Sequence, residues 1–220
     1  MTVANLRSPE QGSLSDAVYD VVHHRIVTGS YRPNQRLVET EIAAELGASR
    51  TPVREALFRL IKDGLATKSR QGLTVREFTF EEVREIYEVR AALEGYAARL
   101  AADRRTPEAL ARIEETLHLH AATSTGETAN RAKVVEANAA FHETVLAAAD
   151  NGRMSTVAAA NLSYFFNNEV AAITSDEALR VALDEHEQIF AALRDRDGEL
   201  AERIVRTHVM AGLKVIESFL

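Results

Sequence analysis

The sequence predicts a mostly α-helical protein in which three helices and a short β-hairpin precede an all-α bundle of six helices. Apolar residues recur with a helical period over most of the 220 residues. Strand-like alternation is confined to residues 65–75, around Arg70-Gln71-Gly72. No strand signal follows Glu77. The hydrophobic fraction of 46% and the charged fraction of 27% are ordinary for a globular protein and exclude a wholly disordered chain.

The N-terminal unit is expected to begin after a flexible tail. Residues 1–12 have weak periodicity and contain a proline and a glycine, two helix breakers. Ser13 can cap the first helix together with Asp16, three residues further on. Apolar residues then follow a helical period as far as Ile26, and Thr28-Gly29-Ser30 ends the helix.

Two short helices and the hairpin complete this unit. The second helix is expected over about Thr40–Leu46, and Gly47 supplies its C-terminal stop. Ser49 or Thr51 caps the third helix, which tolerates Pro52 in its first turn. Asp63-Gly64 ends that helix, and the β-hairpin follows.

The rest of the chain is predicted to be helical. The breaks between helices are short stretches rich in Gly, Pro, Ser, Thr and Asp. The expected helices span about 79–103, 106–122, 129–149, 152–174, 177–194 and 197–219. The predicted organisation is therefore a tail over 1–12, a first domain over 13–76 and a helical domain over 77–220.

Charge is distributed unevenly between the two domains. Residues 1–76 hold 11 Lys+Arg and 8 Asp+Glu, a net charge of +3, whereas residues 77–220 carry −10, within a total of −7. Such asymmetry indicates that one part can meet an anionic partner while the other keeps the protein soluble. The absence of cysteine excludes disulfides, thiolate metal sites and a Cys nucleophile. No apolar run approaches the ~18 residues that span a bilayer, and no secretory signal is evident, so a cytoplasmic protein without membrane contact is expected.

Two short helices separated by Gly47-Ala48-Ser49 and followed by a hairpin are typical of a winged helix-turn-helix. The second helix of that motif enters the DNA major groove with its N-terminus first. Its early residues here are Ser49, Arg50, Thr51 and Arg54. Arginine reads guanine with two hydrogen bonds, and hydroxyls suit phosphates. Arg70 and Gly72 at the hairpin tip would let the wing approach DNA. The alternative is a solvated helix that happens to carry two arginines.

Residues 37–57 resemble the DNA-binding motif of GntR-family transcription regulators. The stretch Ser-Arg-Thr-Pro-Val-Arg-Glu-Ala-Leu at residues 49–57 carries most of the resemblance, which extends over about residues 13–76. It implies DNA contacts by Ser49, Arg50, Thr51, Arg54 and the wing residue Gly72. Some relatives have an arginine near the start of the preceding helix, where this sequence has Thr40.

Polar side chains interrupt the apolar stripes of several predicted helices in the second domain. Arg90 lies on the stripe of the first helix, and Asn138 and His142 lie four apart on the stripe of the third. His186 and His208 lie on the stripes of the last two helices. A buried polar group needs a partner, and inward imidazoles on several helices of a bundle suit a divalent metal such as zinc, nickel or manganese. The alternative is a set of hydrogen-bonded core histidines. The remaining histidines are interpreted as surface or local packing residues: His23, His24, His118 and His120.

This second domain resembles the FCD ligand-binding domain of the FadR subfamily of GntR regulators. The resemblance rests on Tyr87 to Glu94, on Asn138-Ala-Ala-Phe141-His142, on Glu185-His186 and on His208, and covers about residues 79–219. It implies a metal held by Asn138, His142, His186 and His208. Asn replaces the Asp of many relatives, which removes one negative charge and weakens the site. Six helices rather than seven suggest the VanR-like branch.

The same resemblance gives Arg90 a role. Effectors of the family are commonly small carboxylic acids, and a cavity-wall arginine can hold a carboxylate with two hydrogen bonds. The alternative is an internal salt bridge, for example to Glu94.

The sequence therefore predicts a homodimeric, metabolite-responsive regulator, more a repressor than an activator, that binds double-stranded operator DNA. Two alternatives stay open at this point. One is a metal-dependent enzyme, although Glu143, Glu185 and Glu187 are the only acidic residues near the ligands that could serve as a base. The other is a helical dimerisation module in which the histidines are purely structural.

Overall fold

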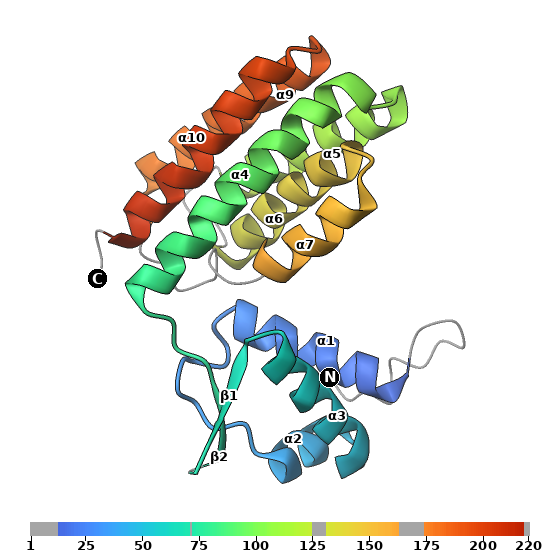
Figure 1. Cartoon of the computed structure of the whole chain (residues 1–220), viewed down its shortest axis with the longest axis vertical. Coiled ribbons are helices and arrows are strands. Elements are labelled where there is room, and N and C mark those ends of the chain that lie inside the picture. The colour runs from blue at the N-terminus through green and yellow to red at the C-terminus, as the bar shows by residue number, and fades with distance from the viewer. Residues whose placement is uncertain (1–12, 71, 125–130, 163–173, 218–220) are drawn as a thin grey trace. The chain divides into compact units, whose positions relative to one another are not determined.

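The computed structural model describes residues 13–70, 72–124, 131–162 and 174–217. The chain divides into two compact units, Met1–Phe78 and Thr79–Leu220 (Figure 1). The mostly helical class, with a winged helix-turn-helix followed by a helical domain, is confirmed. None of the described helices is long and apolar enough to cross a membrane.

The N-terminal unit contains helices α1 (Leu14–Val27), α2 (Glu39–Leu46) and α3 (Arg50–Lys62). Ser13 and Asp16 form the predicted capping box at the start of α1. Gly47 ends α2 with a φ of 64°, a left-handed conformation that favours glycine. Both α1 and α2 pack against α3. The apolar residues Val53, Ala56, Leu57 and Leu60 are buried on α3, whereas Ile61, also expected on this face, is only half-buried.

The hairpin consists of β1 (Ala66–Ser69) and β2 (Gly72–Val75), which pair antiparallel with Ala66 opposite Val75. A further β-bridge joins Arg36 to Thr74, and the amide of Leu37 donates to the carbonyl of Leu73 at 2.9 Å. The segment before α2 therefore pairs with the hairpin and fixes the wing to the helix-turn-helix. Leu65 and Val75, only 2% exposed, anchor the base of the wing in the core.

The second unit is a helical bundle with α4 at its centre. In Figure 1, α4 runs between α9 and α10 on one side and α5, α6 and α7 on the other. The described helices are α4 (Phe80–Arg104), α5 (Pro107–Ser124), α6 (Arg131–Ala148), α7 (Gly152–Leu162), α9 (Asp176–Arg194) and α10 (Gly198–Glu217). The most extensive packing joins α4 to α10.

Small residues on α4 allow α10 to approach closely. A Cβ atom at Gly95 would collide with the Arg206 side chain. This close packing sets the distance between the polar residues of α4 and those of α10.

The predicted helix over 152–174 differs from the structure at its C-terminal end. Thr174 forms a bend, because the next residue, Ser175, is extended and caps α9 through the amide of Ala178. Residues 163–173 lie outside the described residues, as do the predicted tail over 1–12 and the start of the predicted third bundle helix at 129–130.

Candidate metal centre and nucleic-acid interface

The first turn of α3 presents the residues predicted to contact DNA. Ser49, Arg50, Thr51 and Arg54 are all exposed. Ser49 is the N-cap residue, but its side chain makes no capping hydrogen bond. A helix N-terminus carries a partial positive charge and amide N–H groups, which together suit a phosphate. This end of α3 therefore offers both phosphate-binding and base-reading groups.

One carboxylate, which the sequence does not place at the DNA-binding surface, accepts hydrogen bonds from both Arg50 and Arg54. Glu39, the first residue of α2, accepts hydrogen bonds from Arg54 Nε at 3.2 Å and Nη2 at 3.1 Å, and from Arg50 Nη2 at 3.3 Å. These hydrogen bonds, that of Arg54 above all, lower the pKa of Glu39 and keep it ionised. Only the pairing of α2 with α3 in space reveals this contact.

The wing contributes the other predicted residues. Arg70 is exposed, and Gly72 has a φ of +118°, a conformation that side chains disfavour. A Cβ atom at Gly72 would also lie 3.2 Å from Arg36 Nη2. Arg54 and Gly72 line one cavity of about 250 Å³ between α3 and the wing, together with Arg36, Glu39 and Lys68. Thr40, where some relatives carry arginine, is exposed on α2.

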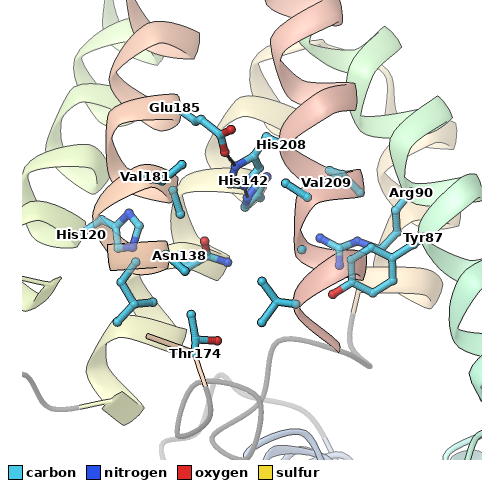
Figure 2. A pocket seen from close by; sticks show the side chains of 16 residues that line it. Tyr87, Arg90, His120, Asn138, His142, Thr174, Val181, Glu185, His208 and Val209 are labelled. Carbon is cyan, nitrogen blue, oxygen red and sulfur yellow. Dashed lines mark hydrogen bonds and ion pairs between the residues drawn. The ribbon is translucent and has the colours of Figure 1, made fainter. Parts of the chain in front are cut away.

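In the helical unit, three predicted histidines converge from three helices. His142 comes from α6, His186 from α9 and His208 from α10. Nε2 of His208 lies 3.1 Å from Nε2 of His186 and 3.2 Å from Nε2 of His142. The candidate ligand atoms of the three rings all lie within 4.8 Å of one another. Asn138, one turn before His142 on α6, lines the same cavity as His142 and His208 (Figure 2).

The opposite nitrogen of each ring has its own partner. Nδ1 of His208 lies 2.7 Å from Oε2 of Glu185, and Nδ1 of His142 lies 3.0 Å from Oε2 of Glu94. Nδ1 of His186 lies 3.0 Å from Nδ1 of His120. The hydrogen bond to Glu185 holds the proton of His208 on Nδ1 and leaves its Nε2 as the electron-pair donor, and the charge of Glu94 close to Nδ1 favours the same tautomer in His142. This pattern orients the Nε2 atoms toward one another.

Burial favours the neutral forms of His186 and His208. It lowers the pKa of His186 well below its ordinary value, and the neighbouring imidazoles lower it further. Burial also lowers the pKa of His208, although Glu185 opposes the shift. Neutral imidazoles with their Nε2 atoms converging are the ligands that first-row divalent ions prefer. The donor set therefore fits a metal ion, to which Asn138 would add an oxygen.

His120, interpreted from the sequence as a surface or local packing residue, is buried. It is 1% exposed, whereas His118 on the same helix is exposed, because residues two apart face different sides of α5. Burial lowers the pKa of His120 to about 4, with His142 and His208 adding to the shift. A buried ring facing a ligand histidine supports the cluster as a neutral hydrogen-bond partner.

The cluster opens into a cavity of about 290 Å³. Figure 2 shows Tyr87 and Arg90 entering it from α4, opposite His120 of α5, with His142 and His208 between them. Much of the remaining wall is apolar and comes from α9 and α10: Ala178, Leu179, Val181, Ala182, Val209, Ala211 and Val215. A small molecule with one polar end and an apolar body matches this lining.

Arg90 makes the internal salt bridge that the sequence offers as an alternative. Its Nε donates to Oε1 of Glu94 at 2.8 Å, and both side chains are less than 10% exposed. Burial opposes ionisation of Glu94, but Arg90 and His142 lower its pKa to about 2. The guanidinium carbon lies 4.8 Å from the centre of the Tyr87 ring. Because Arg90 also lines the cavity, the salt bridge and an anion-binding role are compatible.

Two family models match the chain. Residues 14–75 match the gntR family of bacterial regulatory proteins, and residues 85–211 match the FCD domain. The second match alone covers more than half of the chain.

Individual relatives agree with both matches. The chain is 34% identical to a "Probable D-xylose utilization operon transcriptional repressor" of Paenarthrobacter nicotinovorans, over 91% of this chain and 88% of that protein. It is 28% identical to the HTH-type transcriptional repressor RspR of Escherichia coli, over 95% and 91%. Among solved structures, E. coli McbR/YncC superposes with a TM-score of 0.83 at 24% identity, over 96% of this chain and all of that one. A GntR regulator from Rhodococcus sp. RHA1 superposes with a TM-score of 0.75 at 26% identity, over 95% and 100%. The chain therefore belongs to the GntR family of bacterial transcription regulators, its N-terminal winged helix-turn-helix binds DNA, and its second domain is an FCD domain rather than an enzyme.

Proposed function

We propose that this regulator is a homodimeric repressor that leaves its operator when a small carboxylic acid binds beside a divalent metal ion in the FCD domain. The observation that carries the proposal is the convergence of the Nε2 atoms of His142, His186 and His208 at the wall of a cavity that also contains Arg90. The bound ion would supply an electron-pair acceptor facing the cavity. Asn138 would be its weakest ligand, since an amide oxygen carries no formal charge.

The acid is assigned from the chemistry of the cavity. Arg90 provides a permanent positive charge, and its planar guanidinium can hold a carboxylate with two hydrogen bonds. The apolar lining from α9 and α10 suits the rest of a small organic acid. On the side of the site away from the cavity, Glu94 holds Arg90 in place.

The operator and the dimer follow from the DNA-binding motif. Helix-turn-helix regulators bind two half-sites with two symmetry-related heads. Ser49, Arg50, Thr51 and Arg54 would contact the major groove, and Arg70 and Gly72 the flanking backbone. Repression is proposed because two relatives carry that word in their names. Such a protein would work in the cytoplasm, and the VanR-like branch stays part of the proposal.

The test uses the full chain purified without a histidine tag. Operator DNA is selected from a random double-stranded library, and native mass spectrometry reports the metal content of the dimer. Small carboxylic acids are then titrated into the operator complex while fluorescence anisotropy follows release. The proposal requires about one divalent ion per chain and release by at least one acid. Protein without metal whose DNA binding no acid alters would instead favour the structural alternative, in which the histidines only pack the core.

A further inference from the structure

One carboxylate joins the two proposed ligand sites. Glu94 uses its Oε1 atom to accept from Arg90 Nε at 2.8 Å, and its Oε2 atom lies 3.0 Å from Nδ1 of His142. The three side chains come from α4 and α6 and are all less than 10% exposed. The cavity-wall arginine and the candidate metal ligand are therefore linked through a single buried anion.

The two contacts of Glu94 differ in quality. The contact with Arg90 is an aligned hydrogen bond. Oε2 is buried and close to the imidazole but receives no aligned hydrogen bond from the described residues. The guanidinium of Arg90 therefore interacts with this carboxylate more strongly than His142 does. A charged hydrogen-bond acceptor behind a ligand histidine raises the electron-donating power of the nitrogen on the other side of the ring.

We propose that Glu94 is a positioning residue that couples anion binding at Arg90 to metal binding at His142. The inference rests on the proposed metal and acid sites and adds the connection between them. An anion on the Nη atoms of Arg90 shares the guanidinium charge and weakens its hold on Glu94, which shifts Glu94 toward His142 Nδ1 and strengthens Nε2 as a ligand. By reciprocity, an ion on Nε2 makes Nδ1–H a stronger donor to Glu94 and leaves Arg90 freer for the anion. Acid and metal then bind cooperatively.

The chain contains a matched control. Glu185 is also a carboxylate on the Nδ1 atom of a ligand histidine, His208, at 2.7 Å. Its ion pair is with His208 on α10, whereas that of Glu94 bridges to Arg90. Glu185→Gln therefore removes an equivalent support from the metal without touching the proposed link.

The test is a set of Zn²⁺ titrations of the full-length dimer against a chelating dye, with no organic acid present. Arg90→Gln removes the competitor for Glu94, and its effect is measured in three backgrounds: unaltered, Glu185→Gln and Glu94→Gln. We expect Glu94→Gln and Glu185→Gln each to weaken Zn²⁺ binding by about tenfold. We expect Arg90→Gln to tighten binding severalfold in the first two backgrounds and to leave it unchanged beside Glu94→Gln.

The outcomes separate this inference from the proposed function. If the unaltered chain binds no Zn²⁺, the proposed metal site is wrong. If it binds Zn²⁺ but Arg90→Gln changes the affinity by the same factor in all three backgrounds, the effect is a through-space repulsion and the role of Glu94 is overturned.

Where Arg90→Gln does not fold, the NMR resonance of the His142 Nδ1 proton replaces it. Addition of acetate to the Zn²⁺-loaded dimer should move that resonance downfield in the unaltered and Glu185→Gln proteins, and an unmoved resonance there contradicts the coupling.

Discussion

Glu39, at the first position of α2, accepts two hydrogen bonds from Arg54 of the recognition helix, at 3.2 and 3.1 Å. The two side chains lie on the consecutive helices of the DNA-binding motif, and Arg50 joins them at 3.3 Å. The two arginines proposed to contact DNA are therefore already oriented in the absence of DNA. Since exposed ion pairs contribute little to stability, the value of this contact lies in orientation.

Replacing Arg50 or Arg54 with alanine should weaken operator binding by about 1–3 kcal/mol, because each removes a base or phosphate contact. Lys62→Ala is the control, since it removes one exposed positive charge from the opposite end of α3. Fluorescence anisotropy with operator DNA measures all three variants. Equal losses in the three would mean that only net charge matters and that the assigned recognition surface is wrong.

Glu39→Gln should strengthen binding to random-sequence DNA and so reduce the ratio of operator affinity to random-sequence affinity. The substitution frees two guanidinium groups for phosphates, so the salt dependence should steepen by about one counterion. Glu41→Gln removes the same charge from the same turn of α2 without an arginine contact in the described structure, and should change the slope less. Identical slopes for the two variants would argue against an orienting role for Glu39.

His142→Ala should lose the bound metal, whereas His118→Ala should retain it, because His118 is exposed on α5 away from the cluster. Metal analysis of tag-free protein by mass spectrometry makes this comparison. Equal metal content in the two variants would contradict the ligand assignment.

Acid should remove the metal and loosen the helical domain. Burial holds the pKa values of His186 and His208 below the ordinary value of 6.5, so at these two rings protons compete with the ion at lower pH than they would at an exposed imidazole. In the metal-free protein, the unfolded rings bind protons near pH 6.5 while folded His120 does so only near 4. Unfolding free energy should therefore fall as the pH drops between these values, which thermal denaturation across the range measures.

Arg90→Ala should abolish the response to the releasing acid while leaving DNA binding without acid largely intact. The coupling lost is expected to be about 1–3 kcal/mol, the usual allosteric range. Arg90→Lys should restore it only in part, because a single ammonium cannot make the two-pronged contact. Titration of the acid against operator-bound dimer tests this. If the Arg90→Ala protein responds at the same acid concentration as the unaltered protein, Arg90 does not bind the acid and its role is the salt bridge with Glu94.

The full chain should sediment as a dimer at micromolar concentration, with the FCD domains providing most of the interface. Paired heads are what a two-half-site operator needs. Analytical ultracentrifugation of the tag-free protein gives the mass directly. A monomer under these conditions would contradict the proposal that two symmetry-related heads bind an operator of two half-sites.

Helical periodicity predicted that three polar residues of the FCD domain point inward, but it missed His120, which is also buried. Arg90, His142 and His186 lie on apolar stripes, and all three are at most 8% exposed. Periodicity gives no information on how one helix is rotated relative to another, so it could not predict that His120 of α5 contacts His186 of α9. Glu94 entered the prediction only as an alternative partner of Arg90, because its contact with His142 depends on how α4 packs against α6.

The same reasoning applies to the DNA-binding unit. Turn residues and the order of elements predicted α1, α3 and the hairpin well, since capping and glycine conformations are local properties. Glu39 was outside the predicted interface because its partners lie 11 and 15 residues away on another helix. Local sequence determines that Arg50 and Arg54 are exposed, and tertiary packing determines what holds them.

The three histidines come from helices that are far apart along the chain, since His186 follows His142 by 44 positions and His208 follows His186 by 22. An ion held by all three would cross-link α6, α9 and α10 in a protein that has no cysteine with which to do so. By mass action, free metal at a hundred times its dissociation constant adds about 2.7 kcal/mol to the stability of the folded domain. Chelation would then lower the melting temperature of the helical domain and leave that of the winged helix-turn-helix where it was, so that the supply of metal in the cell would set how much of this regulator stays folded.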